Sequence, residues 1–127
     1  MNPTTIRIGS REVGSTQPCF VLAEVASAHE GSVDQALKML DAAFRMGADG
    51  IKFQMFRSED LVVRRHPGRK DFDQIELTAK EWKKVLRAAR GSGLALLVEA
   101  FDHASLALAA EEQADGYKVH STDMENP

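Results

Sequence analysis

Two stretches of the chain follow nearly the same pattern, and each places a lysine in the middle of a segment that should form a buried strand. The stretches are ADGIKFQ at residues 48–54 and ADGYKVH at residues 114–120, and their lysines are Lys52 and Lys118. Charged groups in such places are costly unless they meet a partner or a ligand. Two of them in one small protein indicate a shared ligand or a shared set of partners.

Each lysine shares a strand face with a second polar residue, because side chains alternate between the two faces of a strand. Lys52 lies on the face of Gln54, and Lys118 lies on the face of His120. If the apolar residues between them pack under helices, the lysines point to the opposite side, toward the interior of a barrel. Other polar residues come late in the predicted strands or directly after them, and these are Glu24, Glu99, Ser121 and Asp123.

The carboxyl ends of the strands hold the active site in parallel α/β sheets and in (β/α)8 barrels. Two ammonium groups that meet there predict an anionic ligand, most simply a phosphate or a carboxylate. The alternative is a structural ion network, in which the lysines pair with Glu24 and Glu99 and neither lysine is free to bind a ligand. The residues alone leave both possibilities open.

The elements that position these residues alternate between strands and helices. Residues 5–13 predict a short hairpin that turns at Gly9 and Ser10. Ser32 and Thr78 are suitable helix N-caps, and Glu81 completes a capping box with Thr78. Apolar runs predict strands at 19–25, 50–55, 94–101 and 116–120, and helical spacing predicts helices at 33–46, 79–91 and 103–114. This β-α-β-α-β-α-β order predicts a parallel sheet with right-handed crossovers.

Composition and charge disfavour several classes of protein. The chain has 127 residues, of which 43% are apolar and 28% charged, as in a globular domain with one core. Its net charge of −3 comes from mixed signs, which gives no support to nucleic-acid or anionic-membrane binding. No run approaches the roughly 20 apolar residues of a membrane span, and the N-terminus lacks a signal-peptide pattern. We therefore expect a cytoplasmic protein. No GxGxxG or GxxxxGK[ST] motif follows a strand, which disfavours nucleotide binding.

Four strings in one order carry a resemblance to a known family: LAEVASAHEGSVDQALKMLDAAFRMGADGIKFQMFRSEDLV, IELTAKEWKKVLRAARGSGL, AFDHASLALAAE and DGYKVHSTDMENP. They resemble the N-acetylneuraminate (sialic acid) synthases, which carry an AE-(I/V)-x-x-x-H-x-G block, a GAD-x-(I/V)-KFQ strand and a YK-(I/V)-x-S segment. The resemblance covers residues 18–127 and leaves residues 1–17 as an N-terminal hairpin and lead-in. It implies an α/β fold, namely the first half of a (β/α)8 TIM barrel truncated after its fourth strand.

The resemblance also implies an activity, in which phosphoenolpyruvate condenses with an N-acylated amino sugar such as N-acetylmannosamine and releases phosphate. By position, Lys52 and Lys118 would hold the phosphate and carboxylate of phosphoenolpyruvate, and Ser121 would donate to the phosphate. Gln54 would bind the intermediate or the sugar, and His29 would lie on the substrate side. Glu24 and Asp123 are the candidates for acid and base catalysis.

The chain departs from the family pattern at one position that matters for binding. Many synthases have STPF after the third strand, with a ligand-binding threonine, where this chain has VEAF with Glu99. We expect Glu99 to face Lys52, Lys118 or the sugar, since its carboxylate would repel the phosphate of the ligand if it lay beside the phosphate site. This departure fits a branch that makes legionaminic acid, pseudaminic acid or a spore-coat polysaccharide.

The resemblance also implies parts that lie beyond Pro127. The family's divalent metal (Mn or Mg) is held by histidines of later strands, and a C-terminal antifreeze-like domain closes the neighbouring subunit's site. The chain ends shortly after the fourth predicted strand, so we expect a fragment without catalytic activity. Four strands from an eight-stranded barrel leave two open edges, so we also expect a homo-oligomer.

Two further functions remain open at this stage. In the first, a Schiff-base aldolase uses Lys52 or Lys118 to attack a carbonyl substrate. In the second, the lysines are structural and the half-barrel is a non-catalytic interaction module.

Overall fold

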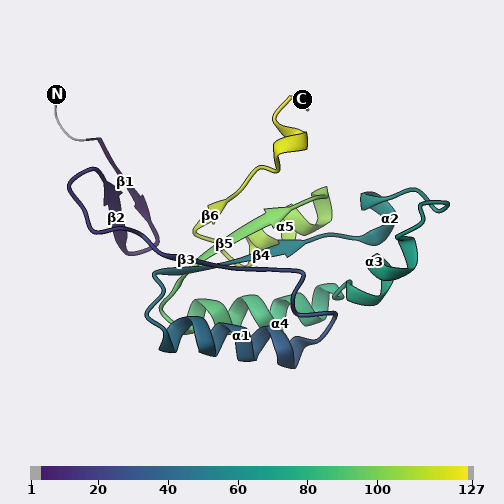
Figure 1. The fold of residues 1–127 in the computed structure, drawn as a ribbon, viewed down its shortest axis with the longest axis horizontal. Helices are drawn as coiled ribbons and strands as arrows, with labels where there is room; N and C mark the ends of the chain where they lie inside the picture. Colours follow the sequence, from purple (N-terminus) through teal and green to yellow (C-terminus); the bar gives the residue numbers. More distant parts are fainter. Residues whose placement is uncertain (1–3, 126–127) are drawn as a thin grey trace.

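The computed structural model describes residues 4–125 and contains two separate sheets (Figure 1). The first is an antiparallel hairpin of β1 (Thr5–Ile8) and β2 (Arg11–Gly14), with Thr5 opposite Gly14. The second is a parallel sheet whose four strands lie side by side in chain order: β3 (Leu22–Ala26), β4 (Gly50–Met55), β5 (Ala95–Ala100) and β6 (Gly116–Tyr117). The predicted hairpin and the parallel sheet are both confirmed.

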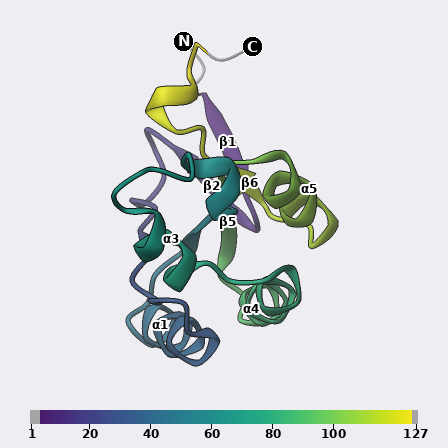
Figure 2. The same ribbon diagram turned by 90° about the vertical axis from the view of Figure 1, so that its right-hand side faces the viewer.

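Three helices connect the parallel strands, namely α1 (Val33–Arg45), α4 (Ala79–Gly91) and α5 (His103–Glu111). Figure 2 shows them in an arc around one side of the sheet, with α4 between α1 and α5. The opposite side of the sheet carries no helix among the described residues. This one-sided arrangement is similar to part of a TIM barrel, in which helices cover the outside of a curved sheet.

The predicted caps begin the two longer helices. Ser32 accepts a hydrogen bond from the backbone N–H of Gln35 at the start of α1. Thr78 accepts from the N–H of Glu81, and the Glu81 carboxylate accepts in return from the backbone N–H of Thr78 at 2.8 Å. The Thr78 hydroxyl also donates to the Glu81 carboxylate at 2.7 Å, and this bond, together with that from the backbone N–H, lowers the pKa of Glu81. The capping box predicted from the sequence is therefore present.

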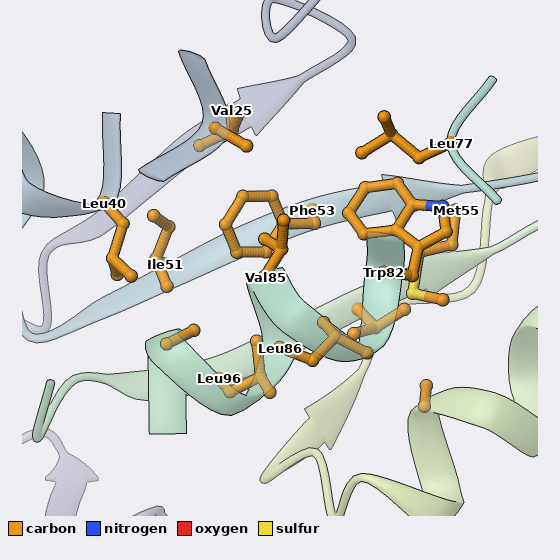
Figure 3. Close-up of a cluster of buried hydrophobic side chains, with 14 of the residues drawn as sticks. Val25, Leu40, Ile51, Phe53, Met55, Leu77, Trp82, Val85, Leu86 and Leu96 are labelled. Carbon is orange, nitrogen blue, oxygen red and sulfur yellow. The ribbon is translucent and has the colours of Figure 1, made fainter. Parts of the chain in front are cut away.

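The core lies between the sheet and the helices (Figure 3). Ile51, Phe53 and Met55 alternate along β4 and are fully buried on the helix side. They pack with side chains of neighbouring elements, including Val85 and Leu86 of α4. Burial of each such side chain contributes about 1.5–3 kcal/mol. Because these apolar residues occupy the helix side, the alternate residues of β4, Lys52 and Gln54, face the side without helices.

Several element boundaries differ from the sequence prediction. The sequence predicts the first strand at 19–25 as an apolar run, but β3 begins at Leu22, and Val21 and Leu22 are exposed. The reason is that β3 has one neighbouring strand, so its outer edge and one face meet no packing partner among residues 4–125. The last strand was expected at 116–120, but β6 contains two residues, and Tyr117 and Val119 are exposed.

The segment between β4 and α4 contains two short helices that the sequence analysis did not anticipate, α2 (Ser58–Leu61) and α3 (Arg69–Ile75). A buried hydrogen-bond pair fixes this segment, because Glu76 accepts from both the backbone N–H and the hydroxyl of Ser58. A 3₁₀ turn, η1 (Ser121–Asp123), follows β6. Residues 56–76 are mostly polar, so their sequence does not show the apolar spacing that predicts a helix.

Candidate functional site

A buried carboxylate at the carboxyl end of β5 joins polar side chains of β4 and of the segment that follows β6. Glu99 is fully buried, and each of its oxygens accepts two hydrogen bonds. Oε1 accepts from Nζ of Lys118 at 2.6 Å and lies 2.8 Å from Nδ1 of His120. Oε2 accepts from Nζ of Lys52 at 2.6 Å and from Nε2 of Gln54 at 3.1 Å. The sequence predicts that Glu99 faces Lys52, Lys118 or the sugar, and in the structure it contacts both lysines.

Strand register brings these groups together. The parallel pairing of β3 with β4 places Glu24 beside Lys52, and that of β4 with β5 places Gln54 beside Glu99. Glu24 reaches Nζ of Lys52 at 2.6 Å, so this ammonium lies between two carboxylates. Six residues form this group, the Glu99 cluster: Glu24, Lys52, Gln54, Glu99, Lys118 and His120.

Electrostatic interactions keep Glu99 and Lys52 ionised. Burial alone would raise the pKa of Glu99, but hydrogen bonds from Lys118, Lys52, His120 and Gln54 hold it well below its usual range. Burial alone would lower the pKa of Lys52, but its hydrogen bonds to Glu24 and Glu99 raise it. Glu99 is therefore a carboxylate and Lys52 an ammonium at neutral pH. A Schiff-base nucleophile must be a neutral amine, so this environment disfavours Lys52 in that role.

The cluster has a buried floor and an exposed rim. Lys52 and Glu99 form the floor, whereas the side chains of Glu24, Lys118 and His120 are 48%, 49% and 33% exposed. The ring of His120 packs beside Phe101, with ring centroids 5.1 Å apart. Lys118 has one carboxylate partner among the described residues and retains further N–H donors. The rim can therefore bind a ligand from the side of the sheet that carries no helix.

The structure brings together five of the eight residues predicted for the site: Glu24, Lys52, Gln54, Glu99 and Lys118. Among residues 4–125, no hydrogen bond or ion pair joins the side chains of the other three to these five. Ser121 and Asp123 are in η1, and within residues 4–125 no hydrogen bond or ion pair joins their side chains to the cluster. Their proposed contacts with substrate stay predictions.

His29 lies in the core, away from the Glu99 cluster. It is fully buried, its Nδ1 accepts from the backbone N–H of Gly31 at 3.2 Å, and its ring meets the edge of Trp82 with centroids 5.4 Å apart. Burial lowers the pKa of His29, so this imidazole is neutral. In this geometry His29 supports the first strand-to-helix loop, and its predicted contact with substrate remains untested.

Sequence reasoning left His120 out of the predicted site, although it is a direct partner of Glu99. The sequence contains a signal for this contact, because His120 lies two residues after Lys118 and therefore on the same face of the predicted strand. The ion network considered as an alternative is also present, since both lysines pair with carboxylates. Lys118 nevertheless stays half exposed, so this pairing does not close the site.

Other features of the molecule lie away from the cluster. A hollow of about 310 Å³ on the helix side is lined by Arg57, Trp82, Ala104 and neighbouring residues of α4 and α5. Across residues 4–125, no three His, Cys, Asp or Glu side chains are grouped so that they could hold a metal ion. Within the same range, no helix has the length and apolar character needed to cross a membrane.

Comparison with known proteins gives one consistent family. The NeuB family matches residues 39–127. A crystal structure of N-acetylneuraminic acid (sialic acid) synthetase from Leptospira borgpetersenii serovar Hardjo-bovis superposes with a TM-score of 0.86 at 26% identity, covering 95% of this chain and 42% of that one. The parallel sheet with its separate hairpin therefore has the fold of part of a sialic acid synthase TIM barrel, while closure of a barrel lies outside what residues 4–125 contain.

Two curated relatives agree with this result. The spore coat polysaccharide biosynthesis protein SpsE of Bacillus subtilis is 42% identical over 62 residues, which is 49% of this chain and 16% of that protein. The mouse N-acetylneuraminate-9-phosphate synthase is 27% identical over 129 residues, covering 91% of this chain and 36% of the enzyme. The chain thus spans about a third or less of the length of these relatives.

Proposed function

Because the chain belongs to the NeuB family, we propose that it forms the phosphoenolpyruvate-binding part of an enzyme that makes a nonulosonic acid. In the proposed reaction, C3 of phosphoenolpyruvate bonds to the aldehyde carbon of an N-acylated amino sugar such as N-acetylmannosamine. Water bonds to C2, and phosphate leaves C2 with the electrons of the broken C–O bond. The observation that carries the proposal is the pair of lysines held by Glu99 at the carboxyl end of the sheet.

Lys118 has the most direct role in this proposal. It is half exposed and has donors left after its bond to Glu99, so it can bind the phosphate or carboxylate of the ligand. Lys52 lies deeper, and Glu24 on the rim is its more exposed partner. Movement of Glu24 away from Lys52 would free a second donor. Glu99 positions both ammonium groups without itself contacting the anion.

The remaining predicted residues complete the proposed roles. Gln54 holds the intermediate or the sugar, and Ser121 donates to the phosphate from the segment that follows Lys118. Of Glu24 and Asp123, one gives a proton to the new alkoxide and the other takes a proton from the attacking water. Either residue can fill either role. The family resemblance implies a divalent metal, Mn or Mg, but the described residues hold no cluster suited to one.

A second candidate function rests on the complete pairing of Lys52. Its ammonium is buried between Glu24 and Glu99, as expected of a structural ion network in a non-catalytic module. This alternative predicts no anion binding at the rim. The family membership and the spare donors of Lys118 favour the synthase.

A chimera tests the proposed function. Residues 18–127 would replace the matching segment of the Leptospira synthetase, whose fold they share, and phosphate release would be followed with phosphoenolpyruvate, N-acetylmannosamine and Mn²⁺. We expect release of one phosphate per sugar acid formed, and none from the 127-residue chain alone. Borohydride with pyruvate should trap no adduct.

Two variants of the chimera serve as test and control. Lys118→Gln should abolish most of the activity, whereas Lys83→Gln, which breaks the exposed pair with Glu111 on the helix side, should leave it unchanged. A folded chimera that releases no phosphate, or one that traps pyruvate, would contradict the synthase assignment.

A further inference from the structure

The charges of the Glu99 cluster cancel before any ligand binds. Lys52 and Lys118 bring two positive charges, and Glu24 and Glu99 bring two negative ones. A ligand with a phosphate and a carboxylate carries at least two negative charges at neutral pH. A neutral cluster attracts such a ligand only weakly from a distance, since opposite charges that lie close together largely cancel beyond their own separation. Another cationic group at the rim would remove this difficulty, and His120 is the candidate.

The contact with Glu99 fixes the proton on one nitrogen of His120. Nδ1 lies 2.8 Å from Oε1 of Glu99, and Glu99 is ionised because its lysine partners lower its pKa. A carboxylate can accept but not donate, so Nδ1 carries the hydrogen. Nε2 then presents a lone pair when the ring is neutral and an N–H when it is protonated. The lone pair of the neutral ring repels an anion, whereas the N–H of the protonated ring binds one.

The position of the ring suits a ligand contact. The side chain is one-third exposed, and Nε2 has no hydrogen-bond partner among residues 4–125. Nδ1 of His120 and Nζ of Lys118 bind the same carboxylate oxygen, so the two side chains are neighbours on the rim. Phe101 packs against the ring and restricts its rotation.

We propose that His120 is a third anion-binding residue of the cluster, which takes up a proton and donates from Nε2 to a phosphate or carboxylate of the ligand beside Lys118. The inference rests on the proposed function, because it concerns the same ligand at the same site. It also gives Glu99 a second task, that of holding Nδ1 of His120 so that Nε2 is left for the ligand. Anion binding is then coupled to uptake of one proton when the pH lies above the range in which the ring titrates.

Sulfate is a suitable probe, because it keeps two charges throughout the pH range in which histidine titrates. Its dissociation constant for the 127-residue chain would be measured at constant ionic strength from about pH 5.5 to 8.5. We expect binding to weaken by about tenfold per pH unit at the alkaline end, the limit for one linked proton. His120→Asn should bind with little dependence on pH, because an amide can keep the bond to Glu99 but cannot ionise.

The control variant is His66→Asn. His66 contacts Phe72 and Gly68 and no member of the cluster, so this variant should keep the full pH dependence. An independent measurement uses the unmodified chain, in which sulfate should move the titration midpoint of the His120 ring resonances to higher pH. The other histidine resonances should not move.

The outcomes separate this inference from the proposed function. Sulfate binding that is independent of pH, or equally dependent in His120→Asn, would overturn the role of His120 and leave the lysine site intact. Absence of sulfate binding at every pH would overturn both. If His120→Asn does not fold, an unchanged midpoint of the His120 resonances in the presence of bound sulfate would still refute the inference.

Discussion

Replacement of Glu99 by glutamine should destabilise the chain strongly, because it removes the one carboxylate that lies at the centre of the cluster. The new amide side chain would keep the shape and could still accept hydrogen bonds from Lys52 and Gln54. The charge would be lost, and Lys52 would remain a buried ammonium with Glu24 as its sole carboxylate partner in the cluster. Lys118 is half exposed, so water can solvate it.

The magnitude follows from the burial of Lys52 and the exposure of Lys118. Removal of one partner from a buried ion pair costs about 3–5 kcal/mol. The lower end applies here, since Lys52 keeps one carboxylate and Lys118 can turn to solvent, so we expect a loss of about 3 kcal/mol. That is a large part of the roughly 5–15 kcal/mol by which domains are stable. A second substitution, Lys52→Met, should restore part of the stability because it removes the uncompensated charge.

The free energy of unfolding would be measured with urea for the unmodified chain, Glu99→Gln and a control, Glu112→Gln. Glu112 is also a buried carboxylate, but its partner Arg87 is mostly exposed, so its replacement should cost much less than that of Glu99. A loss below about 1 kcal/mol for Glu99→Gln would refute the reasoning, because Lys52 would then need no counter-charge.

The pH dependence has a definite sign. Because the pKa of Glu99 is lower in the folded state than in the unfolded state, its contribution is complete at neutral pH, above the unfolded value. It decreases as the pH falls through the range below that value. The difference in stability between the unmodified chain and Glu99→Gln should therefore be constant near neutral pH and shrink below about pH 4.

Three other predictions concern the rim, a helix cap and the sheet edges. Glu24→Gln should tighten sulfate binding by about three- to fivefold, since a partly exposed ion pair contributes up to about 1 kcal/mol and Glu24 competes for Lys52; equal or weaker binding would contradict this. Thr78→Ala should lower the free energy of unfolding by about 1 kcal/mol through loss of the capping box, as urea denaturation would show. Light scattering should find a dimer or larger assembly, because β3 and β6 each have one neighbour in the described sheet and the apolar residues Val21, Leu22, Tyr117 and Val119 are exposed; a compact monomer at micromolar concentration would count against it.

The arrangement of the cluster could be predicted from the sequence because it depends on strand periodicity and order. Ile51 and Phe53 face the helices and Lys52 and Gln54 face the other side, as an interval of two requires. Parallel order then places Glu24 and Glu99 on either side of Lys52. These relations are local in each strand and need no knowledge of loop structure.

The position of His29 could not be predicted in the same way. Its loop has the polar sequence ASAHEG, which favours exposure, but the imidazole lies in the core against Trp82. That burial depends on the packing of α4, which is distant in sequence. The short α2 and α3 are similar cases, since the contact of Ser58 with Glu76 spans 18 residues.

The measurement that tests the central claim most directly is the affinity of the 127-residue chain for phosphoenolpyruvate, compared between the unmodified chain and Lys118→Gln by calorimetric titration. A charge-assisted hydrogen bond contributes about 1.5–3 kcal/mol, so we predict a dissociation constant at least about tenfold higher in the variant. Lys83→Gln, the matched control on the helix side, should bind as the unmodified chain does. Equal affinity of the unmodified chain and Lys118→Gln would contradict the account, because the rim lysine would then have no part in holding the anion.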